Sequence, residues 1–64
     1  ELIRTLAQEA HRYLRPGGCL ALEVGEGQAG EVLELLRQTG AYRGLETVAD
    51  YQGVPRVLRG RRLD

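Results

Sequence analysis

The sequence contains no Met, Lys, Asn, Ser, Phe or Trp, and several of these absences are informative. Without Met the chain does not begin at a natural translation start, so we expect a fragment or a processed piece of a longer protein. The absence of Lys and Asn is typical of a GC-rich genome or of a hot habitat. A chain of 64 residues buries only about 60% of the surface that its unfolded form exposes, which predicts marginal stability.

Long apolar runs and an excess of either charge are also missing. No run approaches the ~20 apolar residues needed to span a membrane, and no signal peptide is recognisable. Nine basic residues, all Arg, balance nine acidic ones, so net charge gives no reason to expect nucleic acid or an anionic membrane as a partner. We therefore expect a cytoplasmic protein with neither of these partners.

Cysteine and histidine occur once each. Cys19 cannot form an internal disulfide or a metal cluster, and its apolar surroundings predict a small buried side chain. A nucleophilic role for Cys19 would need a base nearby, and His11 lies on the preceding predicted helix. Because His11 falls on a polar face of that helix, we expect it to be solvated rather than catalytic.

The residues that are present are organised around an apolar stretch from Gly17 to Gly25. Five of the six residues 19–24 are apolar, and Pro-Gly-Gly precedes them. A short apolar run bounded by glycines is typical of a parallel strand buried on both faces between helical layers. Its one charge, Glu23, is expected near the carboxyl end of the strand, where open α/β sheets meet ligand and solvent.

Helical patterns flank this strand on both sides. Residues 1–14 repeat apolar side chains every three or four positions, and Pro16 with its following glycines ends the pattern. A second amphipathic pattern begins at Ala29, and Gly40 is placed as the left-handed residue just past its end. The apolar positions of the two helices are Leu2, Ile3, Leu6, Ala7, Ala10, Tyr13 and Leu14, then Ala29, Val32, Leu33 and Leu36.

The segment Gly25-Glu26-Gly27-Gln28 connects the strand to the second helix. Strand, glycines and helix start come in the order of a phosphate-binding loop. However, no Gly-Lys-Ser/Thr follows, and Glu26 would repel an anion. We therefore interpret the segment as a tight turn.

Two further strands are predicted, over residues 44–51 and 56–62. In the first, Leu45, Thr47, Ala49 and Tyr51 alternate with Glu46 and Asp50. Gln52-Gly53 supplies a turn, and Pro55 belongs in that turn or at the start of the last strand. Strands joined so closely must run antiparallel. The fold class is α/β, a single partial domain over 1–64 in the order helix, strand, helix, strand, strand.

In this order the chain resembles the C-terminal part of a class I S-adenosylmethionine-dependent methyltransferase, a Rossmann-like fold. There a helix ending in Leu-x-Pro-Gly-Gly feeds strand five, as residues 14–18 do here. Other residues resemble the HemK/PrmC group, the glutamine methyltransferases that modify peptide release factors. These residues are Leu22-Glu23-Val24-Gly25, Gln28, Asp50, Gly53, Arg56, Val57, Gly60 and Arg61.

The resemblance implies a parent enzyme whose chemistry lies outside this chain. The cofactor loop, the acidic residue that holds the cofactor ribose and the Asn-Pro-Pro-Tyr motif of the family all lie upstream, and none occurs here. We therefore assign no catalytic, cofactor-binding or metal-binding residue, and expect the isolated chain to be inactive and to bind no cofactor. Glu23 or Glu26 could line the parent active site, although a solvated or ion-paired carboxylate is the expectation.

Two functions remain open. In the first, the chain is a scaffold that completes the sheet of the methyltransferase, its partners being the rest of that domain and, for the parent, the release factor. In the second, it is a non-catalytic module that docks RNA through Arg56, Arg59, Arg61 and Arg62, although balanced charge and the lack of interleaved aromatics argue against this.

The apolar strand also predicts self-association. In the parent fold, as the resemblance implies, strand five lies between strand four and the final strand, so here the order would be 19–25, 56–62, 44–51. One edge of the apolar strand is then bare, and a bare hydrophobic edge favours pairing with another chain. We expect a homodimer or higher association through residues 19–24.

Overall fold

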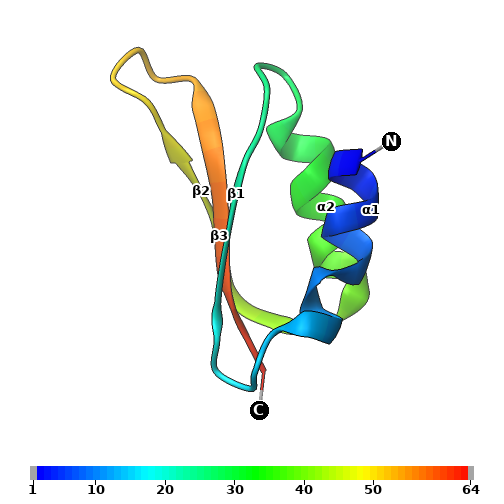
Figure 1. Cartoon of the computed structure of the whole chain (residues 1–64). Helices are drawn as coiled ribbons and strands as arrows, with labels where there is room; N and C mark the ends of the chain where they lie inside the picture. Colours follow the sequence, from blue (N-terminus) through cyan, green and yellow to red (C-terminus); the bar gives the residue numbers. More distant parts are fainter. Residues whose placement is uncertain (1, 64) are drawn as a thin grey trace.

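The structure is a computed structural model and describes residues 2–63. It contains two α-helices, a 3-10 turn and three strands, in the predicted order (Figure 1). In chain order these elements are α1 (Leu2–Glu9), η1 (Ala10–Tyr13), β1 (Cys19–Glu23), α2 (Ala29–Thr39), β2 (Tyr42–Ala49) and β3 (Pro55–Arg62).

The ends of both helices follow from the local sequence. The first helical pattern tightens into η1 after Glu9, and the chain becomes extended at Leu14, before Pro16. Helix α2 ends at Gly40, whose φ of 67° is left-handed and whose N–H donates to the carbonyl of Arg37 at 3.1 Å. Both helix ends were predicted from the sequence. Proline cannot continue a helix, and glycine readily adopts the left-handed conformation that ends one.

The three strands form one antiparallel sheet in the order β1-β3-β2. The predicted strand order and the predicted antiparallel pair of β2 and β3 are therefore confirmed. Strand β1 also runs antiparallel to its neighbour β3, and within residues 2–63 no strand pairs with its other edge. Pro55 begins β3, one of the two positions allowed to it.

Burial of the apolar strand on both faces was wrong for this chain. Both helices lie on one side of the sheet (Figure 1), and only Leu20 on β1 and Val24 just beyond it are buried. Cys19, Ala21 and Glu23 point the other way and are exposed, since two short helices cover one face only. The prediction of a buried Cys19 was therefore also wrong.

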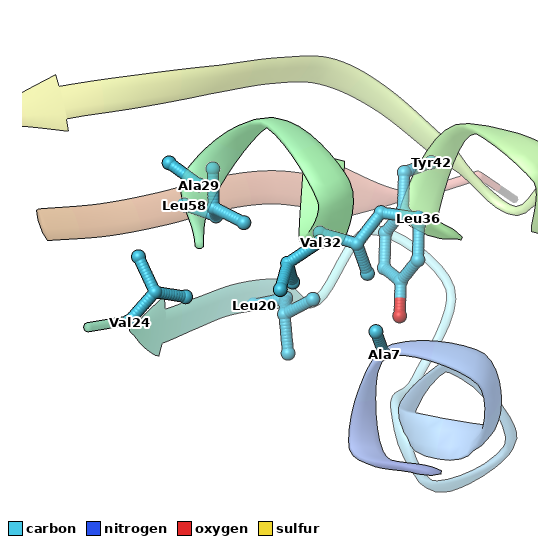
Figure 2. Packing of buried hydrophobic residues seen from close by; sticks show 8 residues of the cluster. All are labelled: Ala7, Leu20, Val24, Ala29, Val32, Leu36, Tyr42 and Leu58. Atoms are coloured by element: carbon cyan, nitrogen blue, oxygen red, sulfur yellow. The ribbon is translucent and has the colours of Figure 1, made fainter. Parts of the chain in front are cut away.

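The core lies between the helical layer and the inner face of the sheet (Figure 2). Leu36, Leu58 and Val32 are the largest fully buried side chains, and they come from α2 and β3. The other buried members are Ala7, Leu20, Val24, Ala29 and Tyr42. Arg4 joins the helices across this layer by a two-pronged ion pair with Glu31, at 2.9 and 3.2 Å.

Strand β2 contains a bulge that the sequence alternation did not predict. Arg43 and Glu46 pair with Arg61 and Arg59, so two residues of β2 lie opposite Gly60 alone. Gly44 adopts a φ of 65° there, and Leu45 is directed at Gly60. Leu45 packs against the core as predicted, whereas Thr47, Ala49 and Tyr51, predicted on the same face, are exposed beyond the helices.

Candidate functional site at the carboxyl end of β1

The turn after β1 is closed by its own polar groups. The N–H of Gly25 donates to Oε1 of Gln28 at 2.9 Å, and the N–H of Gln28 donates to the carbonyl of Gly25 at 3.1 Å. Gly27 has a φ of 83°, which favours glycine. The segment is the predicted tight turn, and the N–H group that a phosphate would use at Gly25 is occupied.

Asp50 lies beside this turn, where β2 passes into β3. Its carboxylate accepts the N–H of Gln52 at 2.8 Å, the N–H of Val54 at 3.0 Å and Nε of Arg56 at 3.1 Å. The hydrogen bond from Val54 is the main reason that the pKa of Asp50 lies below its ordinary 3.8. Partial burial opposes this shift, while Arg56 and Gln52 add to it. Asp50 therefore remains an anion that holds the turn.

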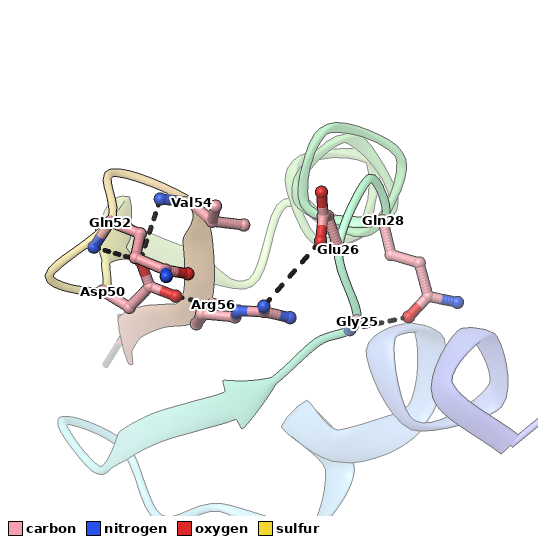
Figure 3. Close-up of polar contacts among 7 residues, drawn as sticks. All are labelled: Gly25, Glu26, Gln28, Asp50, Gln52, Val54 and Arg56. Carbon is pink, nitrogen blue, oxygen red and sulfur yellow. Dashed lines mark hydrogen bonds and ion pairs between the residues drawn. The ribbon is translucent and has the colours of Figure 1, made fainter.

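Arg56 connects the two turns. Its guanidinium lies between Asp50 and Glu26, with an Nη2–Oε2 distance of 3.9 Å to Glu26 (Figure 3). Glu26 is largely exposed, so this second contact is weak. The carboxyl end of β1 is joined to this side of the sheet mainly by the hydrogen bond from the N–H of Val24 to the carbonyl of Arg56 at 2.8 Å, and the contact of Arg56 with Glu26 adds little.

Of the two acidic residues weighed from the sequence, Glu26 belongs to this cluster and Glu23 does not. Glu23 is exposed on the outer face of β1, opposite Val57 of β3. The structure therefore brings Glu26, Asp50 and Arg56 together, and leaves Glu23 apart.

The arrangement at this end of β1 does not fit S-adenosylmethionine, the cofactor that the resemblance implies for the parent. The side chain of Gln28 fills the space over Gly25, where an added Cβ would lie 2.9 Å from its Oε1. Asp50 is committed to three donors of its own turn. Residues 2–63 also bring together no group of three metal-ligating side chains. The hydrogen bonds of the described residues can position the two turns.

The four arginines of the RNA-docking alternative are all engaged within the fold. Arg56 contacts Asp50 and Glu26, and Arg59 contacts Glu46 at 3.3 Å. Arg61 donates to the carbonyl of Gly17 at 2.9 Å, and Arg62 donates to that of His11 at 2.6 Å. They also point to both faces of β3, because their partners lie on both. No single basic surface is formed by these four.

One polar pair was not predicted as a pair. His11, expected to be solvated, is half-buried and packs edge-on against Tyr42, with ring centroids 6.4 Å apart. His11 Nδ1 and the Tyr42 hydroxyl are buried, and neither has a hydrogen-bond partner within residues 2–63. Figure 2 shows this hydroxyl directed at α1 beside Ala7. Burial raises the pKa of Tyr42, and nearby Arg62 opposes the shift.

The sequence signal for this pair was weak. Tyr42 precedes the alternating stretch that predicted the strand, and a single His on a charged helix gives no sign of packing.

In the part of the chain that the structure describes, no helix is long and apolar enough to cross a membrane.

Comparison with known proteins identifies relatives along nearly the whole chain. A release factor glutamine methyltransferase from Gloeobacter violaceus is 41% identical over 58 residues, which cover 91% of this chain and 20% of the relative. The protein of the same name from Moorella thermoacetica is 47% identical over 55 residues, 86% of this chain and 19% of the relative. That from Synechocystis sp. is 35% identical over 63 residues, 98% of this chain and 21% of the relative.

No family model matches the chain, and no solved structure matches it. The chain spans about a fifth of the length of the curated relatives that it matches. The similarity includes most residues of every element described above, and it agrees with the resemblance inferred from Pro-Gly-Gly and the tail pattern. Over nearly its whole length the chain is therefore similar to a segment, about a fifth in size, of proteins named release factor glutamine methyltransferase.

Proposed function

We propose that the chain is the C-terminal part of an S-adenosylmethionine-dependent methyltransferase that modifies a glutamine of a peptide release factor. The observation that carries this proposal is 41% identity over 91% of the chain to a relative that bears this name. The order helix, strand, helix and antiparallel strand pair also fits the end of a Rossmann-like methyltransferase sheet. A cytoplasmic location belongs to the same proposal.

The role of this segment is that of a scaffold. At the carboxyl end of β1, Asp50 holds the β2–β3 turn and the N–H of Val24 donates to the carbonyl of Arg56, which joins β1 to that side of the sheet. In an open α/β sheet this is the end at which ligands bind. A rigid carboxyl end of β1 would keep the neighbouring catalytic residues of the parent in position. No residue of the segment needs to touch the cofactor for this role.

Methyl transfer from labelled S-adenosylmethionine to a purified release factor tests the proposal. The protein encoded by the complete reading frame should transfer label to a glutamine side chain, identified by mass spectrometry. The 64-residue chain alone should transfer none and should give no saturable heat with the cofactor in calorimetry. Transfer by the isolated chain, or a complete protein that methylates no release factor, would contradict the proposal.

A further inference from the structure

The outer face of the sheet, away from both helices, contains an open hollow of about 620 Å³. All three strands line it: Cys19 and Ala21 from β1, Arg59 and Arg61 from β3, and Arg43 and Glu46 from β2. Gly44 and Gly60 also lie at its surface and contribute no side chain. The helices of residues 2–63 leave this face uncovered, as Figure 1 shows.

The charges around the hollow are unbalanced, although the whole chain is neutral. Three arginines line it against one carboxylate, and that carboxylate, Glu46, pairs with Arg59 at 3.3 Å. Arg43 and Arg61 remain. They lie directly opposite each other in the β2–β3 ladder.

Like charges directly opposite each other destabilise a sheet, and within residues 2–63 no carboxylate pairs with Arg43 or Arg61 to offset the cost. Arg61 uses Nη1 for the carbonyl of Gly17, which is a neutral acceptor. The side chain of Arg43 is exposed and makes no hydrogen bond or ion pair to another residue of the range 2–63. A carboxylate placed between the two guanidinium groups would remove the repulsion and satisfy their free donors.

We propose that this hollow binds an acidic peptide segment of a partner protein, with Arg43 and Arg61 holding its carboxylates. The backbone of Gly44 and Gly60 and the methyl group of Ala21 give a floor that suits the methylene stem of a glutamate. Single-stranded nucleic acid would need bases to stack on aromatic rings. Of the three tyrosines, Tyr42 is in the core, and Tyr13 and Tyr51 lie outside the strands, so the hollow has no such ring.

Fluorescence anisotropy with a labelled hexaglutamate peptide at low salt tests the proposal on the 64-residue chain. The wild type should bind it saturably. Because Arg43→Gln removes a charge and the hydrogen bonds that it would donate to the peptide, it should weaken binding about tenfold or more. The matched control is Arg37→Gln on α2, which removes the same charge from the helical side and should change affinity less than about twofold.

A second measurement separates binding from folding. Since Arg43→Gln removes a like-charge pair and breaks no side-chain hydrogen bond or ion pair within residues 2–63, its urea midpoint should equal or exceed that of the wild type. Weaker peptide binding by a variant of undiminished stability would support a binding role. The proposal is overturned if hexaglutamate does not bind saturably, if Arg37→Gln weakens binding as much as Arg43→Gln does, or if a labelled uridine hexanucleotide binds more tightly than the peptide.

Discussion

Asp50 accepts three hydrogen bonds at the turn between β2 and β3, two from backbone N–H groups and one from Arg56. A carboxylate that accepts backbone N–H groups is favoured in its charged form, which is why the pKa of Asp50 falls. The side chain is 22% exposed, so the turn is held in contact with solvent rather than inside the core.

This lowered pKa predicts a pH dependence of stability. The unfolded Asp50 titrates near 3.8 and the folded one below it, so the ionised carboxylate stabilises the fold above that pH. The contribution is lost as the pH falls through the folded pKa. Urea unfolding from pH 7 to about pH 2 should therefore show a steeper acid loss for the wild type than for Asp50→Asn, which should already be less stable at pH 7.

Glu34→Gln provides the control for Asp50→Asn, because Glu34 is an exposed carboxylate on α2. It should change the urea midpoint little at any pH. An Asp50→Asn variant as stable as the wild type at pH 7, with the same acid loss, would contradict the role of Asp50.

At the scale of elements, the sheet depends on a close contact between β2 and β3. A Cβ built on Gly60 would lie 2.7 Å from Cδ2 of Leu45, so the bulge packs Leu45 into the space that glycine leaves. This contact explains why the bulge and Gly60 occur opposite each other in the register.

Gly60→Ala should therefore destabilise the fold by about 1–3 kcal/mol, the usual cost of overpacking. The same change at Gly30 in α2, where nothing lies within 4 Å, should instead stabilise it by up to about 1 kcal/mol. Urea unfolding of both variants measures the difference. In Leu45→Ala the cost of Gly60→Ala should shrink, and an unchanged cost would show that the contact is unimportant.

The sequence predicted those elements whose limits depend on single backbone residues. Pro16 and Gly40 predicted the helix ends, and the short Gln52-Gly53 turn predicted that the last two strands run antiparallel. The bulge was not predicted, because the strand was expected to begin at Gly44, and a glycine at the start of a strand does not indicate a bulge until the register with Arg59 and Arg61 is known. The polar cluster was missed for the same reason, since Glu26 and Arg56 meet only after the sheet has formed.

The burial of β1 was misjudged because apolar composition does not report how many layers surround a strand. Leu20 and Val24 are buried on the inner face of the sheet, whereas Cys19 and Ala21 are small enough to remain exposed on the outer face. Family resemblance, and not periodicity, placed β3 between β1 and β2.

At the scale of the whole molecule, β1 has an unpaired edge within the described residues, and we predict a homodimer through it. The carbonyl of Gly18 and the N–H of Val24 form hydrogen bonds with β3. Because the direction of the backbone groups alternates along a strand, the N–H groups of Cys19, Ala21 and Glu23 point to the bare edge. A two-fold antiparallel pair centred on Ala21 would place Cys19 opposite Glu23 and keep the two Glu23 charges apart.

Sedimentation equilibrium at tens of micromolar should show this association, and Ala21→Pro should abolish it. Proline at that position removes an N–H that faces the edge, whereas Leu20→Pro would damage the β1–β3 ladder itself. Circular dichroism should confirm that the variant remains folded. A well-folded wild-type monomer, or a dimer that survives Ala21→Pro, would contradict the prediction.

The proposed role of this chain is that of a scaffold segment in a release factor glutamine methyltransferase. The most direct measurement is the sequence of the gene around the codon for Glu1. We predict an open reading frame that continues upstream and encodes a glycine-rich loop followed by Asn-Pro-Pro-Tyr. A start codon immediately before Glu1, with no such motif in frame, would contradict the claim and favour an independent module.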